Sequence, residues 1–212
     1  MTEKKGVEYS YKNWGPFVFF TKCPDYIVRK LLIEGRKTLV SYNHQLAGHL
    51  ESQFVFKVET ATWFYNEISP ILEAYREGHC NYHRLEKRHI EFQADSLWIN
   101  FMKAGDFNPP HSHGGDYSFV LYLEIPKGLK KEQSQYKGTS FAPGAIAFEY
   151  GEQQIPRWTT FGIAHTPKVG DMIIFPALLR HWVAPFKAKG KRVSVSGNLS
   201  ITNKDKFPSN YF

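Results

Sequence analysis

The spacing of apolar residues changes character near residue 91. Upstream of it, apolar residues recur every three to four positions, which predicts two amphipathic helices. The first is expected after the Cys-Pro-Asp turn at 23–25, with Asp25 as its N-cap. The second is expected to end near Gly78, with a kink at Pro70. Its apolar stripe consists of Phe64, Ile68, Ile71, Leu72 and Tyr75.

From about Glu91 onward, short alternating segments separated by Gly and Pro predict β-strands. We therefore expect an α+β protein that is a single structural unit. Residues 91–212 are predicted to form an all-β core of the jelly-roll type, and residues 1–90 to supply helices and a strand that support it from outside. The predicted strands have the sequences SLWINFM, YSFVLYLEI, AIAFEY, DMIIFP and KRVSVSGNL.

The composition fits this picture and limits the partners. An aromatic content of 16% suits a β-rich interior. The net charge of +7 allows an acidic partner, but the basic residues lie in short scattered groups without a nucleic-acid-binding motif, so a nucleic-acid partner is allowed without being supported. Two distant cysteines, Cys23 and Cys80, with no signal peptide and no apolar run of membrane length, predict a cytoplasmic protein without a membrane partner.

Histidines near the ends of predicted strands are the clearest candidates for chemistry. His111 and His113 are separated by one residue, so on a strand they point to the same side and could share a metal ion. A second apolar segment, GDMIIFPALLRH at 170–181, ends in His181. Because a jelly roll brings the ends of separate strands together, the two segments predict a metal site.

The last predicted strand has a polar face. Arg192, Ser194, Ser196 and Asn198 alternate with apolar residues and therefore share one side. If that side faces inward, the arginine needs an anion, and a guanidinium beside a hydroxyl forms a cradle for a carboxylate. The alternative is that the face is exposed and Arg192 is one more surface cation.

Several motifs occur in a familiar order. They are Trp98-Ile99-Asn100, Gly105-Asp106, the Pro-His-x-His segment at 110–113, Leu121-Tyr122-Leu123, Gly170-Asp171, Phe175-Pro176, His181 and Arg192-Val193-Ser194. Over roughly residues 91–202, the chain resembles the 2-oxoglutarate/Fe(II)-dependent dioxygenases, in particular the prolyl-hydroxylase-like oxygenases of bacteria and tailed phages. The resemblance implies that the jelly roll is a cupin-like double-stranded β-helix.

The resemblance also implies an activity and a set of ligands. It implies a non-haem oxygenase that uses Fe(II), 2-oxoglutarate and O₂ to hydroxylate a substrate, while 2-oxoglutarate becomes succinate and CO₂. The substrate would be a protein or peptide, for instance a peptidyl proline, or a small molecule. By the same resemblance His181 is the distal iron ligand, Arg192 holds the distal carboxylate of 2-oxoglutarate, and Ser194, Tyr122 and Asn100 are further contacts of 2-oxoglutarate.

The proximal metal ligands stay open, because the family's usual pair is His-x-Asp or His-x-Glu and this chain has His-Ser-His. In one arrangement, which strand geometry favours, His111, His113 and His181 all bind iron. In the other, His113 and His181 bind it together with Asp116, which two preceding glycines could turn inward, and His111 becomes an outer contact. Asp106 is a weaker carboxylate candidate, because it lies in an ordinary turn.

Two other functions fit parts of the sequence. Gly105 and the His-Ser-His segment resemble the opening of a cupin motif, which would give a metal-binding protein without 2-oxoglutarate chemistry. The glutamate expected after the second histidine of that motif is missing, since Tyr117 and Ser118 stand there. A non-catalytic jelly roll, in which the histidines only pack, would be a binding or structural module.

The remaining histidines and one long insert have simpler interpretations. His79, His83 and His89 are irregularly spaced and are expected on a solvated connection. His165 is expected near the mouth of the site. The segment 130–167 is longer than a hairpin needs, and we expect it to shape the access of substrate.

Overall fold

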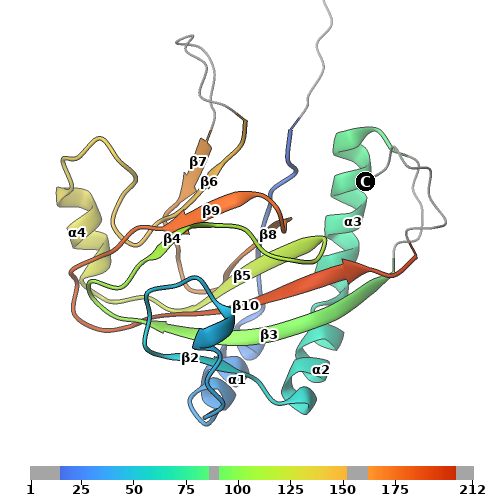
Figure 1. The fold of residues 1–212 in the computed structure, drawn as a ribbon, viewed down its shortest axis with the longest axis horizontal. Helices are drawn as coiled ribbons and strands as arrows, with labels where there is room; N and C mark the ends of the chain where they lie inside the picture. The colour runs from blue at the N-terminus through green and yellow to red at the C-terminus, as the bar shows by residue number, and fades with distance from the viewer. Residues whose placement is uncertain (1–14, 86–90, 152–161, 204–212) are drawn as a thin grey trace, which may run out of the picture.

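The computed structural model describes residues 15–85, 91–151 and 162–203, and this part is built on two facing antiparallel sheets (Figure 1). The strands are β1 (Phe19–Lys22), β2 (Gln53–Val55), β3 (Phe92–Met102), β4 (Asn108–His111), β5 (Tyr117–Glu124), β6 (Ile146–Glu149), β7 (Gly162–His165), β8 (Asp171–Pro176), β9 (Arg180–Val183) and β10 (Arg192–Ile201). The larger sheet has the order β1-β8-β5-β10-β3-β2 and the smaller sheet β4-β9-β6-β7. The predicted jelly-roll core is thus confirmed.

Helices cover the outer face of the larger sheet, as expected of supporting elements (Figure 1). The helical segments are α1 (Asp25–Gly35), the short 3₁₀ helix η1 (Asn43–Gln45), α2 (Val58–Glu67), α3 (Ser69–His83) and α4 (Leu129–Gln135). The first three α-helices pack on this face, whereas α4 lies at one end of the molecule beside the smaller sheet (Figure 1). Within the described residues, no helix is both long and apolar enough to cross a membrane.

The helix predictions need three corrections. The single helix predicted through Pro70 is wrong, because α2 ends at Glu67 and α3 begins at Ser69. Pro70 lies in the first turn of α3, where a missing N–H group breaks no helical hydrogen bond. Asp25 is the first helical residue and not the N-cap, which is Pro24. Helix α3 also runs on past Gly78 to His83.

The two faces of the larger sheet bury different side chains. On β10, Val193, Val195 and Leu199 belong to the apolar cluster under the helices. Arg192, Ser194 and Ser196 point the other way and line a pocket between the sheets. The alternative that this polar face is exposed is wrong, since Arg192 is only 3% exposed. The period of two along one strand therefore separates the structural core from the pocket.

Candidate functional site

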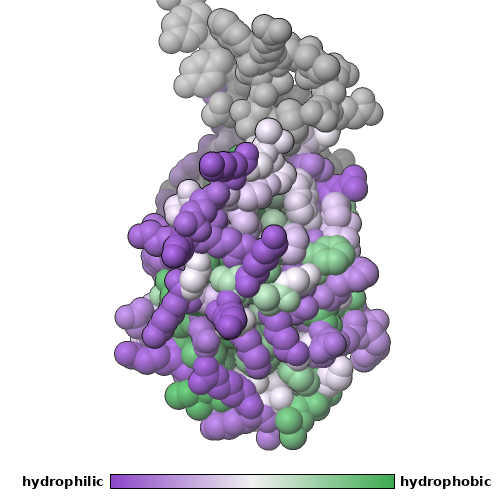
Figure 2. Space-filling view, turned by 90° about the vertical axis from the view of Figure 1, so that its left-hand side faces the viewer, coloured by the Kyte–Doolittle hydropathy of each residue, from purple (hydrophilic) through white to green (hydrophobic). Residues whose placement is uncertain are grey.

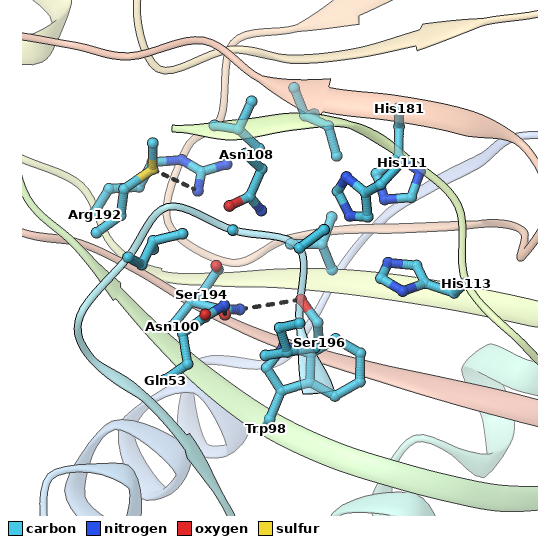
Figure 3. A pocket seen from close by; sticks show the side chains of 18 of the residues that line it. Gln53, Trp98, Asn100, Asn108, His111, His113, His181, Arg192, Ser194 and Ser196 are labelled. Carbon is cyan, nitrogen blue, oxygen red and sulfur yellow. Dashed lines mark hydrogen bonds between the residues drawn. The ribbon is translucent and has the colours of Figure 1, made fainter. Parts of the chain in front are cut away.

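Three histidines meet on the inner side of the smaller sheet (Figure 3). His111 on β4 and His181 on β9 are directly paired across that sheet. His113 follows β4 in the loop to β5, where its backbone N–H donates to the carbonyl of Ala177 at 2.9 Å. One nitrogen from each ring lies within 4.8 Å of the corresponding nitrogens of the other two. The fold therefore brings both predicted histidine segments to one point.

Backbone carbonyls fix the orientation of two of these rings. Nδ1 of His111 lies 2.7 Å from the carbonyl oxygen of Pro109, and Nδ1 of His181 lies 2.8 Å from that of Leu179. Because a carbonyl oxygen only accepts hydrogen bonds, each Nδ1 must carry the proton. Nε2 of each ring is then unprotonated and free to bind a metal.

Burial keeps the three histidines neutral. Burial first, and the charges of neighbouring histidines second, lower the pKa of His113 to about 4 and that of His181 to about 3. Burial also lowers the pKa of His111. Neutral imidazole is the form that binds metals, and imidazole nitrogen suits iron. The donor set therefore fits a divalent iron ion.

Neither candidate carboxylate joins this group. Among the described residues, the three histidines cluster without an aspartate or glutamate. Oδ2 of Asp116 accepts a hydrogen bond from the backbone N–H of Ile201 at 2.7 Å. Oδ2 of Asp106 accepts one from the N–H of Lys103 at 2.8 Å, the turn contact predicted for it. Both carboxylates thus stabilise local backbone away from the histidines.

Arg192 lies at the other end of the same pocket (Figure 3). Its Nη2 donates to the hydroxyl of Tyr122 at 3.2 Å, and its Nη1 lies 3.7 Å from Sδ of Met102. Its Nε is buried without a hydrogen-bond partner, and burial lowers the pKa of the guanidinium. A buried cation without a counter-ion costs several kcal/mol, so this end of the pocket is suited to an anion.

A row of polar side chains crosses the larger sheet beside Arg192. Ser194 on β10 is paired with Asn100 on β3 and with Tyr122 on β5. Nδ2 of Asn100 lies 3.4 Å from Oγ of Ser196, the long end of hydrogen-bonding distance. The structure therefore brings together all four residues predicted to contact 2-oxoglutarate.

Two polar residues of this pocket, Gln53 and Asn108, were not among the predicted site residues. Gln53 on β2 is 2% exposed and donates from Nε2 to Oδ1 of Asn100 at 2.8 Å. Oε1 of Gln53 and Oδ1 of Asn108 are both buried without a hydrogen-bond partner. Asn108 lies between Arg192 and His111 (Figure 3). No local pattern identifies Gln53, because β2 meets the pocket only through its pairing with β3.

The loop of residues 46–50, which we call the covering loop, forms one wall of the pocket. The backbone N–H of His49 donates to the carbonyl of Phe107 at 2.9 Å, and their rings stack with centroids 4.6 Å apart. A Cβ atom on Gly48 would lie 2.4 Å from Oδ1 of Asn108 and 2.3 Å from Cδ1 of Leu50. A side chain at position 48 would therefore force the side chains of Asn108 and Leu50 to move.

The other histidines differ from their predictions. His165 does not line the pocket; its Nε2 lies 2.7 Å from Oδ2 of Asp171. His79 and His83 are on α3 and not on a solvated connection. The ring of His79 packs near that of Tyr117, with centroids 6.0 Å apart. His79 and His165 therefore have contacts that their spacing in the sequence did not show, whereas His83 is exposed.

Parts of the long insert lie outside the described residues, as does His89. The described part of 130–167 contains most of α4 and the strands β6 and β7. Ile146 on β6 lines the pocket, whereas no residue of α4 does. A role of the insert in substrate access stays a prediction.

Residues 96–198, just under half of the 212-residue chain, match the family model for 2OG-Fe(II) oxygenases. This part of the chain is similar to the 2-oxoglutarate/Fe(II) oxygenases. The match begins within β3 and ends within β10, so it includes the three histidines and Arg192 of the pocket. Gln53 and the covering loop lie outside it. No curated protein matches the chain significantly.

Solved structures share the fold of this chain across most of its length. The viral collagen prolyl hydroxylase vCPH of Paramecium Bursaria Chlorella virus-1, in a 2OG complex, has a TM-score of 0.52 and 16% identity, covering 87% of this chain and 96% of that one. A prolyl hydroxylase of Trichoplax adhaerens, in complex with a hypoxia inducible factor peptide fragment, has a TM-score of 0.55 and 11% identity, covering 89% and 84%. The α-ketoglutarate-dependent epimerase SnoN from nogalamycin biosynthesis has a TM-score of 0.55 and 13% identity, covering 86% and 78%. At these identities the likeness establishes the fold, and the reactions of these proteins differ.

Proposed function

We propose that the protein is a 2-oxoglutarate- and Fe(II)-dependent hydroxylase, with His111, His113 and His181 as its iron ligands. Arg192 binds the distal carboxylate of 2-oxoglutarate. The observation that supports this assignment most strongly is the presence, in one pocket, of three converging neutral imidazoles and a buried guanidinium without a counter-ion.

Bound Fe(II) supplies the activation of O₂ that couples conversion of 2-oxoglutarate to succinate and CO₂ with hydroxylation of a substrate. The protein would hold the ion, and its ligands determine the net charge of the metal centre. Three neutral ligands do not offset the charge of a divalent cation, whereas the usual carboxylate would. In this proposal the dianionic cosubstrate therefore provides the neutralisation, and 2-oxoglutarate and metal bind more tightly together than apart.

The polar row positions 2-oxoglutarate and separates it from water. Arg192 offers two kinds of donor, Nε and the Nη groups, which suits a carboxylate held in a bidentate manner. The hydroxyls of Tyr122 and Ser194 and the amide of Asn100 lie beside it. The covering loop closes one wall of the pocket. Exclusion of water by such a wall strengthens every charge interaction inside.

The substrate in this proposal is a protein or peptide, with a peptidyl proline as the first group to test. Support comes from the solved relative that binds a peptide fragment. We also propose a cytoplasmic setting, in line with two cysteines that are both free and buried.

A coupled assay tests this function. Metal-loaded protein is incubated with 2-oxoglutarate, ascorbate and a library of proline-containing peptides, and succinate and the masses of the peptides are measured. The proposal predicts succinate formation and the gain of one oxygen atom by some of the peptides. Metal binding without any affinity for 2-oxoglutarate would instead support a cupin of another kind. Binding of neither would support a non-catalytic jelly-roll module.

A further inference from the structure

Two short loops that are distant in sequence lie side by side at one end of the molecule. They are the segment 125–131, which leads into α4, and the segment 184–191, which leads into β10. A Cβ atom on Gly128 would lie 3.5 Å from Cβ of Ala188, and one on Gly190 would lie 3.6 Å from Cβ of Pro126. The structure thereby combines two groups of basic residues that look scattered in the sequence. This lysine face consists of Lys127, Lys130, Lys131, Lys187, Lys189 and Lys191.

The backbone beneath the lysine face is well anchored. Leu129 is fully buried and Phe186 is 1% exposed, so each loop has an apolar anchor in the core between the sheets. The carboxylate of Glu132 accepts the backbone N–H groups of Lys187 and Ala188 at 2.8 to 3.0 Å. The exposed lysines therefore lie on a fixed scaffold, and Nζ of Lys191 lies 5.3 Å from the centroid of the Phe101 ring.

The positive charge of this face is largely uncompensated. All six lysines are exposed, and none forms an ion pair with a described carboxylate. Glu132 is the one acidic residue of segments 125–132 and 184–191, and its oxygens are occupied by backbone N–H groups. Figure 2, which views this end of the molecule, shows hydrophilic side chains across the face with apolar ones between them.

A groove adjoins the lysine face at Lys187. Its walls include Phe141, Pro143 and Pro185, with Tyr136 at one side. The aromatic rings already have neighbours: Phe141 packs on Trp182 with centroids 5.4 Å apart, and a Cβ atom on Gly138 would lie within 3.0 Å of the Tyr136 ring. Phe141 is thus covered, whereas Tyr136 is 38% exposed. Successive nucleic-acid bases stack on several exposed rings, and a groove with one such ring beside cations better suits a polypeptide with mixed acidic and apolar side chains.

We propose that the lysine face and its groove form a docking site for an acidic segment of a protein partner, separate from the oxygenase pocket. Carboxylates of the segment bind the lysines, and an apolar side chain enters the groove. None of the six lysines lines the pocket, so the site holds a partner without taking part in the chemistry. Long-range attraction of this kind raises association rates and weakens with salt. This proposal does not depend on the identity of the reaction.

Fluorescence anisotropy with defined peptides tests the docking site. The probe is a labelled peptide of about twelve residues with the repeat Glu-Glu-Phe-Glu, long enough to span both loops. Its binding to the full chain is compared with that of the same peptide in which Ser replaces Phe, and with a labelled thymidine oligonucleotide of equal charge. The test variant carries Lys127→Glu, Lys130→Glu and Lys189→Glu. A matched control carries Arg29→Glu, Lys57→Glu and Lys168→Glu, which change the net charge equally on other exposed positions.

The proposal predicts that the test variant loses at least tenfold in affinity for the probe, while the matched control loses less than about threefold. The Ser peptide should bind at least about threefold more weakly than the Phe peptide, because the groove is left unfilled. Consumption of 2-oxoglutarate without substrate should be the same in both variants, so a failure of docking is distinguishable from a failure of the proposed reaction. Equal losses in both variants, tighter binding of the oligonucleotide, or no binding of the probe would each overturn the docking site.

Discussion

Replacement of Arg192 by methionine separates two effects of the buried guanidinium: its cost to the stability of the free protein and its contribution to the binding of 2-oxoglutarate. Methionine keeps an unbranched side chain of similar length and removes the guanidinium. In the protein without ligands, Arg192 is 3% exposed and its Nε is unpaired. Its Nη groups contact the hydroxyl of Tyr122 and the sulfur of Met102, and its Cζ lies 4.7 Å from the centroid of the Tyr122 ring, so no carboxylate offsets its charge. The substitution should therefore not destabilise the free protein, although most changes at a buried position do.

The expected magnitudes have opposite signs. Removing a buried unpaired charge in favour of a hydrophobic side chain stabilises by about 1 to 3 kcal/mol, and the hydroxyl of Tyr122 loses its donor at a cost of about 1 kcal/mol. The net change in unfolding free energy should lie between zero and a gain of about 2 kcal/mol. Loss of one partner of a desolvated ion pair should weaken binding of 2-oxoglutarate by about 2 to 5 kcal/mol. That corresponds to about 30-fold to a few thousandfold in Kd.

Calorimetric titration of 2-oxoglutarate into Mn(II)-loaded protein and thermal unfolding without ligand measure the two effects. Lys191→Met is the matched control, because Lys191 is the adjacent cation and is exposed. Its affinity for 2-oxoglutarate should stay within about threefold of the parent protein, as expected for a surface charge. An Arg192→Met protein that binds 2-oxoglutarate normally, or that melts several degrees lower, would refute the assignment of Arg192 as a poised anion-binding group.

Three further predictions concern the metal, the covering loop and pH. His181→Ala should lower the affinity for Mn(II) at least tenfold. Asp116→Asn should leave this affinity within about twofold and lower the unfolding free energy by about 1 kcal/mol. A larger loss of Mn(II) affinity in Asp116→Asn than in His181→Ala would favour the carboxylate arrangement. Gly48→Ala should displace the covering loop and raise protease cleavage near residue 48, and an unchanged cleavage rate would place the loop elsewhere. Burial lowers the pKa of His79 from 6.5 to about 4. Between these pH values the unfolded chain binds a proton that the folded chain excludes, so the free energy of unfolding falls as the pH drops from 6.5 toward 4. In metal-free protein, His79→Gln should reduce this loss of unfolding free energy by about 1 kcal/mol, since the ring is only partly buried. Urea unfolding at pH 6.5 and pH 4 measures the loss, and an equal loss in the variant and the parent protein would contradict this reasoning.

Features with a short period were predictable from the sequence. The alternation along 192–196 predicted which side chains of β10 face the pocket, because successive residues of a strand point to opposite sides. Asn198, predicted on the same face, does not line the pocket, since the register shifts after it and its Oδ1 accepts a hydrogen bond from Ser118. The spacing of His111 and His113 placed them within reach of one another for the same reason. The apolar strand β8 belongs to the larger sheet, and the chain then crosses to β9 of the smaller sheet, where His181 pairs with His111. Local patterns in the sequence were therefore sufficient to predict the histidines and the arginine of the candidate site.

Features that depend on contacts between distant segments were not predictable. The apolar stripe stays nearly in phase through Pro70, so nothing in the pattern marked the break between α2 and α3. Gln53 reaches the pocket only because β2 pairs with β3. The lysines of 127–131 and 187–191 look scattered along the chain and become one face only when the two loops pack together. In each case the information lies in the pairing of elements and not in any single window of sequence.

The linkage between metal and 2-oxoglutarate tests the central claim most directly, because it requires the histidines and Arg192 to serve one site. The measurement is the Kd of 2-oxoglutarate by calorimetry with and without Mn(II), for the parent protein and for His181→Ala. We expect Mn(II) to tighten binding of 2-oxoglutarate at least tenfold in the parent and to have no effect in the variant. An affinity for 2-oxoglutarate that is the same with and without metal in the parent protein would contradict the account.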